Sequence, residues 1–197
     1  MFNDYSKIRK WEIAGFIWIV LIGSLLHFTY DWSVKSSIVA LFSPVNESVW
    51  EHLKMVYFTV LFFILIEYWF INRYTNSFFL AKTISVLSMN LFIVIVFYSY
   101  TAITKSPNLI IDIGSFVVGA MICQFISFKI MKIKVSSTLN NIGLISFILM
   151  GCIFVVFTFY TPKLPIFKDS NTGEYGVVQT QVFHNLFISY ETPGSII

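Results

Sequence analysis

The residues that could do chemistry gather around the first two apolar runs of the chain. His27 and Asp31 lie four residues apart near the end of the first run. Glu47 and Glu51 have the same spacing before the second run, and His52 follows directly. Histidines and carboxylates together can bind a divalent metal such as zinc, or transfer protons. The predicted metal ligands are His27, Asp31, Glu47 and Glu51, and the predicted catalytic groups are Glu51 and His52.

Three functions fit such a group at a membrane boundary. The first is metal-assisted or acid–base chemistry on a lipid headgroup. In this chemistry Glu47 and Glu51 would act as ligand or general base. His27 and Asp31 would act as ligand and orienter, and His52 as general acid. The second is a small transporter or proton-coupled permease, and the third is a static network in a structural partner subunit. Because no spacing matches a metal motif such as H-E-x-x-H, the sequence leaves open whether the protein is an enzyme.

The segment from Ser43 to Lys54 is predicted to begin a helix outside the membrane. Serine before proline is typical of a helix start, because the hydroxyl can cap free amides and proline tolerates the first position. No breaker follows, so one helix is expected from Pro44 to Ile71, about 42 Å long at 1.5 Å per residue. On that helix Glu47 and Glu51 would share one face.

Five apolar runs must position these groups. With 57% hydrophobic and 12% charged residues, the chain has too little polar surface for a soluble protein of this size. Abundant aromatic residues, few glycines and two cysteines exclude a disordered chain, a collagen and a disulfide scaffold. Backbone amides must be paired within lipid, so each run is predicted to be a helix. The fold class is an all-α integral membrane protein with five transmembrane helices in residues 1–161, spanning about 11–30, 46–71, 79–103, 108–128 and 139–160.

Basic residues give the predicted orientation, because cytoplasmic ends are enriched in lysine and arginine. The N-terminus and the second and fourth connections hold eight basic residues, and the other side holds five. The N-terminus is therefore expected inside and the C-terminal tail, residues 162–197, outside. Two prolines prevent the last span from continuing as a helix. The tail then either folds over the outer ends of the helices or stays flexible.

Other polar residues in the runs are interpreted as structural. Glu67 is expected to pair with Lys82 or Arg73, since charges within a membrane pair with one another. Glu12 is expected to pair at the interface with the basic N-terminus. Asp112 lies about one turn into the fourth span, at the depth of the candidate site.

Three stretches resemble a bacterial family of small polytopic membrane proteins of unknown function. They are LHFTYDWS at 26–33, SPVNESVWEHLK at 43–54 and PIFKD at 165–169, followed by Gly173 and Tyr175-Gly176. The resemblance implies a multi-pass protein of the cytoplasmic membrane and brings no activity or cofactor. The expected partners are membrane lipid and either a second copy or a membrane complex. Nucleic acid is not expected, because the basic residues are spread over the loops without a compact patch.

Overall fold

The structure is a computed structural model that describes residues 5–177. Its five long helices are α1 (Tyr5–Trp32), α2 (Val49–Ile71), α3 (Phe78–Thr104), α4 (Leu109–Met131) and α5 (Ser137–Phe159). Three short 3-10 turns are η1 (Val39–Leu41), η2 (Asn72–Tyr74) and η3 (Pro165–Phe167). Within residues 5–177 there is no strand, and Lys168 and Tyr175 form one isolated antiparallel bridge. The predicted all-α fold with five helices is confirmed.

All five helices are long and apolar enough to cross a membrane. They contain 23 to 28 residues, and 23 residues make a helix of about 35 Å, which exceeds a hydrocarbon core of about 30 Å. Large apolar side chains face outward along the bundle, among them Leu21, Leu65, Leu91, Phe125 and Ile148. These features are those of a multi-pass membrane protein.

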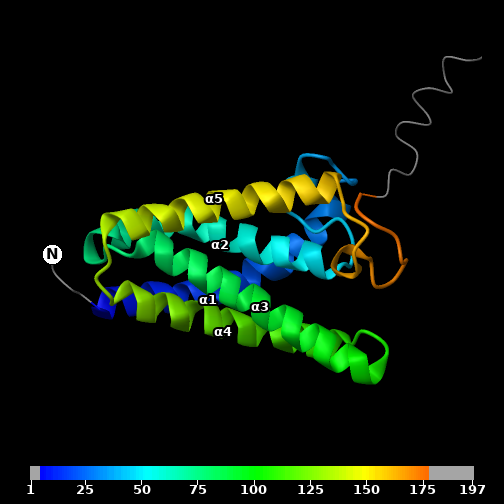
Figure 1. Ribbon diagram of the computed structural model, residues 1–197, viewed down its shortest axis with the longest axis horizontal. Helices are drawn as coiled ribbons and strands as arrows, with labels where there is room; N and C mark the ends of the chain where they lie inside the picture. Colours follow the sequence, from blue (N-terminus) through cyan, green and yellow to red (C-terminus); the bar gives the residue numbers. More distant parts are fainter. Residues whose placement is uncertain (1–4, 178–197) are drawn as a thin grey trace, which may run out of the picture.

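The helices run side by side along the long axis of the molecule (Figure 1). The first helix packs on α2 and α4, whereas α3 packs on α4 and α5. Gly143 lets α5 approach the backbone of α3, because a Cβ atom there would lie 2.5 Å from the backbone of Leu80. The interior is mostly apolar, and buried charged groups occur near both ends of the bundle.

The two ends of the bundle differ in the segments that they contain. The loop end contains the α1–α2 connection (residues 33–48) and the segment after α5 (residues 160–177), which folds across it in orange in Figure 1. The N-terminal end contains the start of α1 and the connections after α2 and α4. Of the predicted tail, residues 178–197 lie outside the described residues.

Candidate metal centre at the loop end

The α1–α2 connection is fastened to α1 by the buried side chain of Ser43. Its hydroxyl donates to the carbonyl of Leu26 (2.7 Å) and accepts from the amide of Tyr30 (3.1 Å). A regular helix would pair these two backbone groups with each other, since they are four residues apart. The sequence predicted Ser43 as the cap of the next helix, and this prediction is wrong. Ser43 instead binds the turn of α1 that contains His27.

The helix of the SPVNESVWEHLK stretch starts at Val49, and not at Pro44 as predicted. Ser48 is its N-cap, with an extended backbone and a side chain that accepts from the amide of Glu51. Serine is preferred at both helix caps and turns, so Ser43 and Ser48 could not be told apart by residue type. The correction matters because Glu47 lies before the helix and shares no face with Glu51.

Three ligand atoms from three different elements meet at the loop end. His27 belongs to α1, Glu47 to the α1–α2 connection and His52 to the first turn of α2. Glu47 Oε2 lies 3.6 Å from His27 Nε2 and 3.5 Å from His52 Nε2. The two Nε2 atoms are 3.3 Å apart. In a tetrahedral zinc site with bonds of about 2.0–2.1 Å, neighbouring ligand atoms are about 3.3–3.4 Å apart. The group His27, Glu47 and His52 therefore has nearly the spacing of three zinc ligands.

The backbone of α2 fixes the tautomer of His52. Its Nδ1 lies 2.8 Å from the carbonyl oxygen of Ser48. A carbonyl only accepts hydrogen bonds, so Nδ1 holds the proton and Nε2 of the neutral ring presents its lone pair to Glu47 and His27. Metal-binding histidines commonly have such a carbonyl or carboxylate behind the ring. The hydrogen bond from Nδ1 of His52 therefore leaves a free lone pair on its Nε2, which is what a metal ion requires.

The segment after α5 holds the backbone of Glu47 on both sides. The amide of Glu47 donates to Asp169 Oδ2 at 3.2 Å. Its carbonyl accepts from the hydroxyl of Ser170 at 3.0 Å. Asp169 is itself fixed, because its other oxygen accepts from the amides of Asn171 and Thr172. Nearby, Asn46 donates its side-chain amide to the carbonyl of Gly176.

The group is partly open to solvent, with side-chain exposures of 30% for His27, 31% for His52 and 41% for Glu47. Contact with His27 holds the pKa of the Glu47 carboxyl below its ordinary value; partial burial opposes this effect, and the nearby His52 assists it. An ionised carboxylate and a neutral imidazole are the forms that bind metals. Catalytic zinc sites use three protein ligands and keep one position open, whereas structural zinc sites are closed by a fourth protein ligand; this partly exposed group offers three candidate ligands.

Glu51 belongs to a separate, buried ion pair. Its Oε2 lies 2.6 Å from Lys54 Nζ and accepts from the amide of Val45, and its Oε1 accepts from the hydroxyl of Thr158. Lys54 also donates to the carbonyl of Ala40. Adjacent helical residues point about 100° apart. This geometry places His52 toward α1 and Glu51 toward the end of α5.

The other two predicted carboxylates lie outside the group. Asp31 is exposed on α1 one turn after His27, and the set of mutually close ligand atoms does not include it. Asp112 accepts from the hydroxyl of Tyr100 at 2.7 Å and thereby joins α4 to α3. Tyr100 also accepts from the amide of Asn108 in the α3–α4 turn. Asp112 therefore organises that hairpin.

The polar residues predicted at the N-terminal end meet in the bundle interior. Lys82 Nζ lies 2.7 Å from Glu67 Oε2, one of the two pairings expected for Glu67. Glu12 does not pair with the basic N-terminus as predicted, because its Oε1 lies 3.1 Å from the same Lys82 Nζ. All three side chains are almost completely buried. One lysine thus meets two carboxylates.

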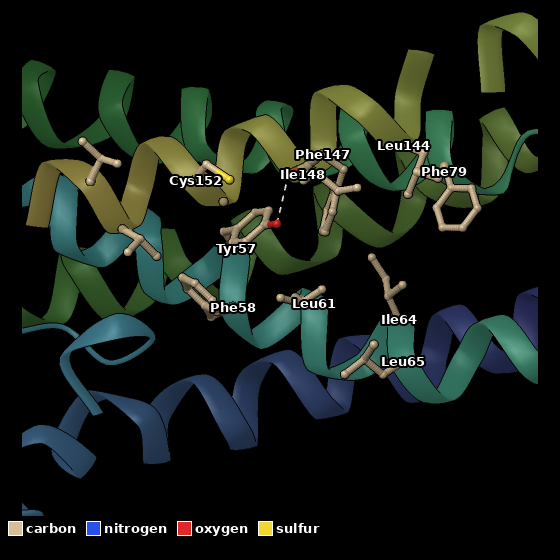
Figure 2. A pocket seen from close by; sticks show the side chains of 13 residues that line it. Tyr57, Phe58, Leu61, Ile64, Leu65, Phe79, Leu144, Phe147, Ile148 and Cys152 are labelled. Atoms are coloured by element: carbon tan, nitrogen blue, oxygen red, sulfur yellow. Dashed lines mark hydrogen bonds between the residues drawn. The ribbon is translucent and has the colours of Figure 1, made fainter. Parts of the chain in front are cut away.

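An apolar groove of about 580 Å³ lies between α2 and α5. Figure 2 shows Tyr57 and Leu61 from α2 facing Phe147 and Cys152 from α5. Tyr57 donates its hydroxyl to the carbonyl of Phe147 at 3.0 Å. The groove contains none of the three candidate metal ligands. Its lining is what a helix surface in contact with lipid chains would present.

Several positioning residues of the candidate site were not found from the sequence. Ser43, Asp169 and Ser170 hold the backbone around His27 and Glu47, and Thr158 joins Glu51 to Lys54. The partners of Asp169 and Thr158 are more than 100 residues away along the chain. The available signal was the polar PIFKD stretch directly after an apolar span.

The model for a family described as a family of unknown function, DUF6512, matches residues 1–177. No curated protein and no solved structure matches the chain. The family match includes all three candidate ligands and the segment that holds Glu47. The chain therefore belongs to the family of unknown function DUF6512.

Proposed function

We propose that the protein is a multi-pass membrane protein that binds a divalent metal ion, zinc in the first instance, through His27, Glu47 and His52. The observation that carries this proposal is the triangle of 3.3, 3.5 and 3.6 Å between the three ligand atoms. Imidazole and carboxylate ligands suit zinc. The tautomer of His52 supports the same assignment.

The chemistry we propose is metal-assisted attack on a polar headgroup at the membrane surface. A metal with three protein ligands can hold water or a substrate oxygen at its fourth position, polarise a phosphoryl or acyl group, and generate hydroxide near neutral pH. The candidate ligands lie at the ends of two helices that could span the membrane, where headgroups would be within reach. A lipid or lipid-linked headgroup is therefore the proposed substrate class.

We further propose that the N-terminal end faces the cytoplasm and the metal site faces outward from the cell membrane. Lys54 and Lys82 are buried in ion pairs and contribute nothing to surface charge. Without them, the sequence places seven basic residues at the N-terminal end and four at the loop end. Such a bias favours a cytoplasmic N-terminal end.

The test is the metal content of purified protein after exposure to zinc and removal of loosely bound ions. The intact chain should retain one zinc per molecule. His52→Ala and Glu47→Gln should each reduce the content to well below one, because two ligands hold zinc much more weakly than three. Asp31→Asn is the matched control, since it removes an exposed carboxylate one turn from His27 and should leave the content unchanged.

Folding of each variant would be verified by its elution as a single species in detergent. Folded wild-type protein that retains no zinc, or any other divalent ion, would contradict the proposal. Equal loss in Asp31→Asn and His52→Ala would restore Asp31 as a ligand and would contradict the three-residue set.

A further inference from the structure

The cluster of Glu12, Lys82 and Glu67 has two acidic groups for one basic group in the buried interior of the bundle. Exposure is 4% for Glu12, 1% for Lys82 and 0% for Glu67. With all three side chains ionised, the cluster would have a net charge of −1 in the interior of the bundle. Burying an uncompensated charge is so unfavourable that a carboxyl group normally takes up a proton instead.

The surroundings of the two carboxyls differ. Glu12 has several hydrogen-bond donors around it, because its Oε1 accepts from the ammonium of Lys82 and from the hydroxyl of Ser127 (2.7 Å). Its Oε2 lies 2.7 Å from the side-chain amide of Gln124, whose nitrogen donates to it when the amide oxygen faces the amide of Phe16. Three donors stabilise a carboxylate. Glu12 is therefore the ionised member.

Glu67 lacks such donors. Its Oε2 lies near Lys82 Nζ, but neither of its oxygens accepts a hydrogen bond of good geometry, and Oε1 has no polar partner among the described residues. A fully buried, unpartnered carboxylate oxygen carries a large desolvation penalty. That penalty is much smaller when the group is neutral.

The other groups around Glu67 do not supply the missing positive charge. The nearby titratable groups are Glu12 from α1, Lys82 from α3 and the thiol of Cys123 from α4. The single titratable residue of α5 is Cys152, which lines the apolar groove. Lys82 is thus the only cation that faces the two carboxyls among residues 5–177.

We infer that the cluster of Glu12, Lys82 and Glu67 is a proton-binding site and that Glu67 is the carboxyl that takes up the proton. One proton from water forms an O–H bond with a Glu67 oxygen, and the cluster changes from a charge of −1 to neutral. Glu67 lies four residues before the end of α2, or about 6 Å along the helix. The proton therefore has about one helical turn to travel from the N-terminal end.

Infrared spectroscopy of the full-length protein in detergent or lipid tests this assignment directly. An undissociated carboxylic acid has a carbonyl stretching band that a carboxylate lacks. The wild-type protein should show one such band at neutral pH, and the band should disappear on alkaline titration. Glu67→Gln should remove the neutral-pH band completely, whereas the exposed Glu174→Gln should leave it unchanged.

Other results would overturn the inference. Absence of the band from folded wild-type protein at neutral pH would show that no carboxyl is protonated. Glu67→Asp and Glu12→Asp keep the charge of the cluster, so they identify the protonated position: with ¹³C-carboxyl-labelled aspartate the band should shift in Glu67→Asp, and a shift in Glu12→Asp instead would move the proton to Glu12. If Glu67→Gln did not fold, the two aspartate variants would still decide, because labelled aspartate shows which of the two positions holds the proton.

Discussion

Lys54 and Lys82 are both buried in the bundle, at 0% and 1% exposure, yet they have different partners. Lys54 meets one carboxylate, and its ammonium also donates to the carbonyl of Ala40 and the hydroxyl of Thr158. Lys82 lies between the two carboxyls of Glu12 and Glu67. The first pair is balanced in charge and has its hydrogen bonds satisfied. The second cluster is not balanced, and Oε1 of Glu67 has no hydrogen-bond partner among the described residues.

The difference shows that the number of carboxyl groups around a buried lysine, and not burial alone, decides whether the group has one charge state or two. The Glu51–Lys54 pair joins the start of α2 to η1 and to the end of α5, directly beside the proposed metal ligands. It can serve as a fixed support. The cluster around Lys82 has two charge states that differ by one proton, so it can respond to its surroundings.

The largest effect is expected when the balanced pair is broken. Glu51→Gln leaves the Lys54 ammonium buried without a counter-charge, which should lower the free energy of unfolding by about 3–5 kcal/mol. Unfolding in detergent micelles, compared with the wild type, measures the loss. The double variant Glu51→Leu with Lys54→Met should recover most of it, because a packed apolar pair needs no counter-charge. A stable single variant would mean that Lys54 reaches water.

The next effect in size is stabilisation by metal. At a free zinc concentration of about 100 times Kd, binding to the folded state alone should stabilise the protein by about 2.7 kcal/mol. A rise in Tm on adding zinc, reversed by a chelator, measures this stabilisation. His52→Ala should abolish the rise, and Asp31→Asn should retain it. A zinc-dependent rise of the same size in His52→Ala would place the ion elsewhere.

A smaller effect is expected when Glu47 loses its support. In Asp169→Asn the remaining side-chain oxygen still accepts from the backbone amide of Asn171. The new side-chain NH₂ then faces the backbone N–H of Glu47, and two donors cannot form a hydrogen bond. Zinc affinity should fall about 10–100-fold, as it does when groups behind metal ligands are altered. Competition against a zinc indicator measures the change. Glu174→Gln, in the same segment but exposed, is the control and should bind as the wild type does.

The smallest effect is expected for Glu67→Gln, although it is the same chemical change as Glu51→Gln at an equally buried site. Because we infer that Glu67 is already neutral, the amide replaces an uncharged acid of the same shape. The free energy of unfolding should change by less than about 1.5 kcal/mol, the net contribution of one hydrogen bond. Losses of similar size in Glu51→Gln and Glu67→Gln would remove the distinction between the two lysines.

The sequence was sufficient for the five helices, because length and apolar composition alone decide whether a segment can cross a membrane. It was not sufficient for the start of α2. Both Ser43 and Ser48 are helix-capping residues, and only the contact of Ser43 with α1 excludes the earlier start. That error of five residues put Glu47 on the predicted helix and thereby placed it on one face with Glu51.

The candidate ligands were predicted in part. His27 and Glu47 were assigned to the metal and His52 to acid catalysis, and the structure brings these three side chains together. Their binding of a metal stays a prediction. The contacts that hold them could not be predicted, because residues 46–47 and 169–176 are joined only by the folding of the complete chain. Nothing in their local spacing indicates this pairing.

Fixing both the amide and the carbonyl of Glu47 has a thermodynamic consequence for any ligand of this site. A loop that must become ordered on binding loses conformational entropy and thereby weakens affinity. Here the peptide groups on either side of the carboxylate are already immobilised by Asp169 and Ser170. An incoming ion would therefore restrict ligand side chains but little of the Glu47 backbone, and the site is preorganised to bind with little loss of entropy.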